Sequence, residues 1–218
     1  MNPFPVVLSA PSGGGKTTVA RELMRRRTDV GYSVSCTTRA PRTDERDGVD
    51  YHFLSDAAFA ERRDRGELAE WAVVHGRQYG TLTSEIERVL DSGRHVLMDI
   101  DVQGAVQFAT VFPKCVMVFV LPPSVDVLME RLRARNTEDS AALLTRLRSA
   151  KAELGQVDRY HYVVVNDELA ATVDQVSAVI DAEMVKRERV RELGANVGAL
   201  VARLEREIEA LDALQVAR

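Results

Sequence analysis

The sequence predicts an α/β fold in which helices flank both faces of a parallel sheet, and three observations support this prediction. Apolar runs without polar alternation, as expected of strands covered on both faces, occur at 4–9, 95–100, 115–121 and 160–165. Segments with helical spacing separate these runs, at 17–27, 83–91, 102–112, 124–133 and 140–157. A glycine-rich turn joins the first strand to the first helix. Such folds bind ligands at the carboxyl ends of their strands, so we expect the functional site there.

The size and composition of the chain are typical of a globular protein with one substantial core. Its 218 residues are 45% hydrophobic and 28% charged. No apolar run approaches the roughly 18 residues of a membrane span, so we expect a cytoplasmic protein without a membrane partner. The net charge of −4 argues against a nucleic-acid partner. Cys36 and Cys115 lie far apart in the sequence, and we expect both to be free thiols.

Two segments interrupt the alternation of strands and helices. Residues 32–81 contain short predicted strands at 33–37, 51–54 and 68–74 around one helix at 55–65, which indicates an inserted α+β lobe. Residues 126–155 contain two predicted helices around an arginine-rich polar segment, which indicates a helical lid. The remaining core comprises 1–31, 82–125 and 156–185. Together these parts form one domain, 1–185, followed by an extension, 186–218.

The extension is predicted to form a long amphipathic helix. Its apolar residues nearly follow a seven-residue repeat, at Val190, Leu193, Val197, Leu200, Leu204, Leu211 and Leu214. Glu207 interrupts the repeat, and Gly194 and Gly198 weaken it. A helix that packs on its own domain is the favoured interpretation, and a coiled-coil homodimer is the alternative.

The glycine-rich turn has the composition of a phosphate-binding loop. It consists of Ala10, Pro11, Ser12, Gly13, Gly14, Gly15, Lys16 and Thr17, and Thr18 follows it. Backbone N–H groups of such a turn converge on a phosphate chain at a helix N-terminus. Lys16 would contact the β- and γ-phosphates of ATP, and the Thr17 hydroxyl would ligate Mg²⁺. Ala10 replaces the first glycine of the general pattern, which is acceptable if its φ is negative. The loop predicts a P-loop NTPase fold.

Other residues suit the same chemistry. Asp99 ends a buried strand, where a carboxylate would organise the Mg²⁺ cofactor near Thr17. Arg39 and Arg42, held by Pro41, offer planar guanidinium groups to a phosphate dianion. The hydroxyls of two tyrosines would complete this phosphate site, Tyr51 and Tyr79.

Several motifs in order make the chain resemble the guanylate kinases over about residues 4–185. They are Ser33 to Arg42, with Ser-x-Thr-Thr-Arg-x-Pro-Arg inside it, Gly48 to Phe53, Glu70-Trp71, Tyr79-Gly80-Thr81, Asp99 to Gly104, Arg131-Leu132, Arg135 to Glu138, Arg146-Leu147 and Val165-Asn166-Asp167. The resemblance implies transfer of the γ-phosphoryl group of ATP to GMP and dGMP. It makes residues 32–81 a GMP-binding lobe. Asn136 departs from the family pattern, which has glycine there.

The roles of the residues that would bind guanine, and of the arginines of the predicted lid, rest largely on this resemblance. A carboxylate would accept both donors of the guanine edge, and Glu70 is the candidate. The resemblance implies the same role for Glu70 and adds Ser35, Thr81 and Asp101 to the GMP site. It implies that Arg131, Arg135 and Arg146 close over the ATP phosphates, so that Lys16, Arg39, Arg135 and Arg146 are the catalytic set. It implies an adenine contact for Asn166.

Two alternatives stay open at this point. The first is a non-catalytic guanylate-kinase-like module that binds other proteins; such modules usually have a damaged P-loop, whereas Lys16, Thr17 and Asp99 are present here. The second is a kinase of the same class that acts on another nucleoside monophosphate.

Overall fold

A computed structural model describes residues 2–74, 76–134 and 140–216 of the chain. The described chain divides into two compact units, one of residues 3–180 and the other of residue 2 with residues 181–216. The predicted P-loop, lobe and lid all belong to the first unit. Within the described residues, every helix is too short or too polar to span a bilayer.

A five-stranded parallel sheet forms the centre of the first unit. Its strands are β1 (Pro5–Ser9), β2 (Val30–Tyr32), β7 (His95–Asp99), β8 (Val116–Leu121) and β9 (Tyr162–Val165), in the spatial order β2-β7-β1-β8-β9. All four predicted strands are confirmed, and their carboxyl ends meet at one edge. The strand β2 was not predicted, because three residues are too few to show a pattern.

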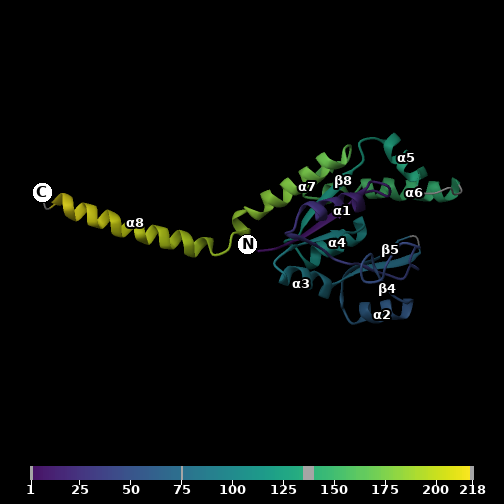
Figure 1. The fold of residues 1–218 in the computed structure, drawn as a ribbon, viewed down its shortest axis with the longest axis horizontal. Coiled ribbons are helices and arrows are strands. Elements are labelled where there is room, and N and C mark those ends of the chain that lie inside the picture. Colours follow the sequence, from purple (N-terminus) through teal and green to yellow (C-terminus); the bar gives the residue numbers. More distant parts are fainter. Residues whose placement is uncertain (1, 75, 135–139, 217–218) are drawn as a thin grey trace. The chain divides into compact units, whose positions relative to one another are not determined.

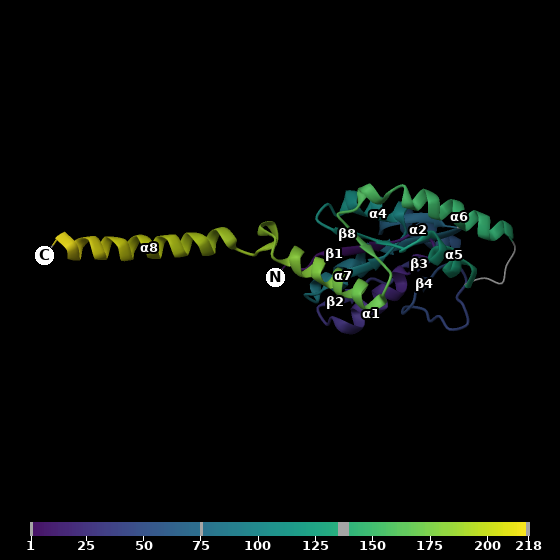
Figure 2. The same cartoon turned by 90° about the horizontal axis from the view of Figure 1, so that it is seen from above.

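Helices cover both faces of this sheet, as predicted. Those next to the sheet are α1 (Lys16–Arg26), α3 (Thr83–Asp91), α4 (Val102–Val111) and α7 (Leu169–Met184). Figure 2 shows α4 on one side of β1 and α1 with α7 on the other. Ile86 of α3 and Phe108 of α4 are fully buried in one core cluster with Val7 of β1. The apolar positions that suggested helices are therefore the buried ones.

The predicted inserted lobe is a second, smaller sheet with one helix. Its strands are β3 (Cys36–Thr37), β4 (His52–Phe53), β5 (Leu68–Val74) and β6 (Arg77–Leu82), in the order β4-β3-β6-β5, and its helix is α2 (Asp56–Asp64). Figure 1 shows this lobe beside the central layers. Cys36, Phe59 and Leu82 form its buried core. The strand β6 was not predicted, because its sequence is largely polar and contains Gly80.

The predicted lid consists of α5 (Val125–Ala134) and α6 (Ser140–Leu154), and a short 3₁₀ turn, η1 (Val157–Arg159), follows. Leu128 and Leu132 of α5 pack against Ala150 of α6, so the two helices have a small core of their own. Arg135 and Asn136, for which the sequence predicted a catalytic and a conformational role, lie outside the described residues.

In the C-terminal unit, the predicted extension, 186–218, is not one continuous helix over its described residues. The helix α7 ends at Met184, a 3₁₀ turn η2 (Arg187–Arg189) follows, and α8 (Leu193–Val216) begins after Glu192, whose φ is 53°. The buried Glu183 carboxylate pairs with Lys186 at 2.5 Å and Arg189 at 3.1 Å, which fixes the turn. The predicted repeat therefore describes α8, and only its first member, Val190, precedes that helix.

Candidate functional site

The P-loop connects β1 to α1 at the carboxyl edge of the sheet. Gly13 and Gly15 have φ angles of 86° and 91°, a left-handed backbone that favours glycine. Gly15 is the N-cap of α1, so the free N–H groups of the first helical turn face the loop. Among the described residues, Glu192 is the non-glycine residue with positive φ, so Ala10 fits its place without strain. The geometry is that of an anion-binding turn.

The two side chains that follow the glycines both contact Asp99 at the end of β7. Lys16 Nζ donates to the backbone oxygen of Asp99 at 2.7 Å, and Thr17 Oγ1 donates to Asp99 Oδ2 at 2.7 Å. The hydroxyl of Tyr32 donates to the other carboxylate oxygen, Oδ1. Thr17 and Asp99 thus present hard oxygen atoms side by side, which suits Mg²⁺. Within the described residues, no group of three or more His, Cys, Asp or Glu side chains is arranged to hold a metal ion.

The lid and the last strand also contact the P-loop. Asn166 Nδ2 donates to the backbone oxygen of Gly14 at 2.9 Å, and Arg131 donates to the backbone oxygen of Asn166 at 3.1 Å. Arg146 Nη2 lies 3.5 Å from Ser12 Oγ. Glu153 of α6 accepts from the Ser12 N–H at 2.7 Å. The predicted ATP-binding residues therefore converge on one loop, and the adenine contact of Asn166 stays a prediction.

A cleft of about 1160 Å³ separates the P-loop from the lobe. From the core it is lined by Ser12, Thr17, Thr18, Tyr32 and Asp99, from the lobe by Arg42, Glu45, Asp50 and Tyr51, and from the lid by Thr145 and Arg146. Three parts of the sequence that lie far apart thus face a single cavity. Arg21 of α1 and Asp50 of the lobe form an exposed ion pair of 3.5 Å beside it.

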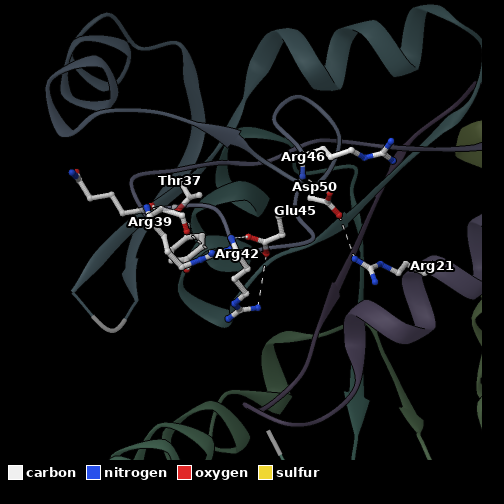
Figure 3. Close-up of polar contacts among 10 residues, drawn as sticks. Arg21, Thr37, Arg39, Arg42, Glu45, Arg46 and Asp50 are labelled. Carbon is white, nitrogen blue, oxygen red and sulfur yellow. Dashed lines mark hydrogen bonds and ion pairs between the residues drawn. The ribbon is translucent and has the colours of Figure 1, made fainter. Parts of the chain in front are cut away.

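The lobe arginines contact a carboxylate that the sequence analysis did not single out, Glu45. Arg39 donates to Glu45 Oε1 at 2.8 Å, and Glu45 Oε2 accepts from the Arg42 N–H at 2.8 Å (Figure 3). The hydrogen bond from Arg39 lowers the pKa of Glu45, so this carboxylate is ionised at neutral pH. Arg42 itself is 77% exposed and reaches into the cleft. Glu45 therefore orients Arg39 and leaves Arg42 accessible.

Both predicted tyrosines lie around the Arg39 guanidinium. Arg39 Nε donates to Tyr79 Oη at 3.2 Å, and its Cζ lies 5.5 Å from the ring centroid of Tyr51. The two rings meet edge to face, with centroids 6.0 Å apart. Burial raises the pKa of Tyr51 to about 12, so its hydroxyl is a hydrogen-bond donor at neutral pH. The structure thus brings the predicted arginine and both predicted phenols together, and that these groups hold a phosphate stays a prediction.

Glu70 lies at the bottom of the lobe in a largely dry environment. It is 4% exposed, and Thr81 Oγ1 donates to its Oε1 at 2.6 Å. Burial raises the pKa of Glu70 to about 7, and the nearby charge of Asp101 adds to this shift. A Cβ atom at Gly104 of α4 would lie 2.2 Å from Glu70 Oε2. Glycine at position 104 therefore leaves the space that the carboxylate occupies.

Ser35 and Asp101 are the other two residues predicted for the base site. Ser35 is 9% exposed and immediately precedes β3. The backbone turns between Asp99, the last residue of β7, and Asp101, the N-cap of α4. Asp101 Oδ1 accepts from the N–H groups of Gln103 and Gly104 at 2.7 and 3.1 Å. Because of this turn, the Asp99 carboxylate points toward the P-loop, whereas Asp101 lies near Glu70.

Sequence reasoning missed Tyr32, Glu45 and Glu153. Glu45 carried a signal, since an acid three residues after Arg42 is within reach of both arginines. Tyr32 and Glu153 carried none, because their partners lie 67 and 141 residues away in the sequence.

Comparisons with known proteins agree in one family. The family model described as guanylate kinase matches residues 2–183. A guanylate kinase of Thermotoga maritima is 44% identical over 84% of this chain and 88% of its own length. A guanylate kinase from Anaeromyxobacter dehalogenans is 45% identical over 87% of this chain and 82% of its own length. A crystal structure of guanylate kinase from Anaplasma phagocytophilum superposes with a TM-score of 0.74 at 34% identity, over 88% of this chain and 92% of that one.

The raised pKa of Glu70 predicts a pH-dependent stability. The folded protein binds more protons than the unfolded chain between about pH 4.5 and 7, so its stability falls as pH rises through that window. Between pH 4.5 and pH 8, we expect the free energy of unfolding of wild type to fall by on the order of 3 kcal/mol more than that of Glu70→Gln. Urea unfolding at both values measures the difference. Glu61→Gln, on the exposed side of α2, keeps Glu70 and should lose stability with rising pH as wild type does, and parallel curves for Glu70→Gln and wild type would contradict the prediction.

Proposed function

The chain belongs to the guanylate kinase family and is an ATP:GMP phosphotransferase, and we propose that the cleft between P-loop, lobe and lid is its active site. The observation that carries this proposal is the presence of two anion-binding sets on one cleft. Ser12, Thr17 and Thr18 of the P-loop line it from the core, and Arg42 and Tyr51 line it from the lobe. Two phosphate-bearing substrates can therefore bind facing each other.

ATP binds on the core side. Its phosphates accept hydrogen bonds from the N–H groups of the P-loop, residues 10–18, and Lys16 contacts the β- and γ-phosphates. Arg131 and Arg146 approach the loop from the lid and balance charge on the transferred group. Arg135 is proposed to act with them. Thr17 and Asp99 hold Mg²⁺, which neutralises phosphate charge when it is bound.

The phosphate of GMP binds on the lobe side. Arg39 and Arg42 contact it with Tyr51 and Tyr79. Because Glu45 accepts from Arg39 at 2.8 Å, it keeps this guanidinium in place before the phosphate arrives. A dianion with three oxygens competes well for such a group, since it offers more acceptors than one carboxylate.

Guanine is recognised deeper in the lobe. The ionised Glu70 accepts from N1–H and from the 2-amino group, with Ser35, Thr81 and Asp101 around it. Adenine presents an acceptor at N1, so the carboxylate rejects it. The contacts we assign go to the base and the phosphate, so dGMP is accepted as well.

The chemical step needs no general base from the protein. The second pKa of a phosphate monoester is about 6, so the attacking oxygen of GMP is already ionised at neutral pH. A bond forms between this oxygen and the γ-phosphorus of ATP. The bond from γ-phosphorus to the β–γ bridging oxygen breaks, and ADP leaves with the electron pair. The protein contributes alignment of the substrates, charge neutralisation and the exclusion of water.

A non-catalytic interaction module is not supported. Such a module would have no need for the contacts of Lys16 and Thr17 with Asp99. The curated relatives are named guanylate kinase, and the chain matches them over most of their length.

We also propose that α8 pairs with a second copy of the chain. Its exposed apolar side chains recur along the helix, at Val197, Leu200, Val201, Leu204, Ile208 and Leu211. Val201 and Ile208 alternate with Leu204 and Leu211 at the spacing of a two-stranded coiled coil.

The first test is ATP-dependent phosphorylation of GMP. We expect Lys16→Ala to lower kcat at least about a hundredfold, because a charged donor to the transferred group is lost. Glu70→Gln should raise KM for GMP by about tenfold or more and leave KM for ATP unchanged, because an amide N–H₂ faces the guanine donors. AMP, UMP, TMP and dGMP are assayed beside GMP. Preference of wild type for AMP, UMP or TMP would contradict the assignment of Glu70.

Gly104→Ala tests the shape of the base pocket. The new Cβ would lie 2.2 Å from Glu70 Oε2 and push the carboxylate away. We expect about a tenfold or larger rise in KM for GMP, with KM for ATP unchanged. Gly194→Ala, in open space on α8, is the control. A normal KM for GMP in Gly104→Ala would contradict the role of this glycine.

Light scattering tests the pairing of α8. We expect wild type to have the mass of a dimer at high micromolar concentration and Leu204→Glu to be a monomer, because a charge on the apolar face opposes its burial. Arg203→Glu on the same helix controls for the added charge. A monomeric wild type would contradict the proposal.

A further inference from the structure

Tyr32 ends β2 next to the end of β7. The two strands are parallel, with Tyr32 in register with Leu97. Because side chains alternate along a strand, Asp99 projects on the same face as Leu97 and therefore on the same face as Tyr32. The helix α1, which carries Thr17, packs against β7 and β2. The phenol, the carboxylate and the threonine hydroxyl thus come together from three elements.

The Asp99 carboxylate has one donor on each oxygen. Thr17 Oγ1 donates to Oδ2 at 2.7 Å, and the Tyr32 hydroxyl donates to Oδ1. With only the Thr17 contact, the carboxylate could rotate about its Cβ–Cγ bond. The second donor, on the other oxygen, opposes that rotation. Tyr32 also lines the cleft, so the pair lies where the phosphates of both substrates meet.

The hydroxyl of Tyr32 acts as a donor and not as a base. The carboxylate oxygen that it contacts is an acceptor, so the phenol supplies the proton of this hydrogen bond. The transfer reaction needs no general base from the protein either, because the attacking phosphate oxygen is already ionised. A role in holding Asp99 is what remains for this hydroxyl.

We propose that Tyr32 is a positioning residue for the magnesium site: its hydroxyl fixes the Asp99 carboxylate toward Thr17, so that Mg²⁺ bound with ATP meets an oriented acceptor. This inference rests on the proposed function, and it assigns to Tyr32 a role in ATP binding that depends on the metal. The aromatic ring is not part of the proposal, so phenylalanine at this position separates the hydroxyl from the packing of the ring.

Calorimetric titration with a non-hydrolysable ATP analogue tests the proposal, once with saturating Mg²⁺ and once with EDTA. We expect Tyr32→Phe to weaken binding about tenfold with Mg²⁺ and less than about twofold without it, because a hydrogen bond to a charged group is lost only where the orientation of Asp99 matters. Tyr162→Phe, on β9 and outside the cleft lining, is the matched control and should bind like wild type. Thermal unfolding checks that all variants are folded.

A double-mutant cycle with Asp99→Asn shows whether Tyr32 acts through Asp99. We expect Tyr32→Phe to have little further effect in the Asp99→Asn background. Equal weakening with and without Mg²⁺, additive effects in the cycle, or wild-type binding by Tyr32→Phe would each overturn the proposal. GMP phosphorylation by wild type is measured in parallel. Its absence would refute the proposed function, whereas an active wild type with an unaffected Tyr32→Phe would refute only this inference.

Discussion

Two phosphate groups that repel each other must meet in one cleft, and this electrostatic constraint accounts for the position of most charged side chains in the site. The P-loop provides N–H groups and Lys16 on one side, and the lobe provides Arg39 and Arg42 on the other. The parallel sheet makes this arrangement possible, because the ends of β1, β2 and β7 lie at one edge. Asp99 at that edge lies within hydrogen-bonding distance of both Thr17 and Tyr32.

In the absence of substrate, the cationic side chains of the proposed site hydrogen-bond to acceptors of the protein itself. Glu45 serves Arg39 in this way, and the backbone oxygen of Asp99 serves Lys16. Such contacts keep the cationic side chains in place, which lowers the entropy lost when a phosphate binds. They are short-range and local, so the exchange of a carboxylate for a phosphate requires no change in the fold.

Glu70 shows how recognition and stability oppose each other in this protein. Its burial raises its pKa to about 7, which disfavours the ionised form in the empty pocket. In the role proposed for Glu70, the same burial makes the carboxylate discriminate between bases, since a mismatched hydrogen bond cannot be replaced by water there. Gly104 allows the carboxylate to occupy this buried position, because any side chain at residue 104 would displace it.

The sequence by itself determined the P-loop, the four longer strands of the central sheet and the residues that we propose to contact phosphate and base, because these depend on local patterns and on side-chain chemistry. Only the tertiary structure decided that 30–32 and 77–82 are strands, since pairing with β7 and β5 holds these short or polar segments extended. It also decided the break before α8. The partnership of Tyr32 with Asp99 depends on strand register, and no pattern within either segment encodes a contact across 67 residues.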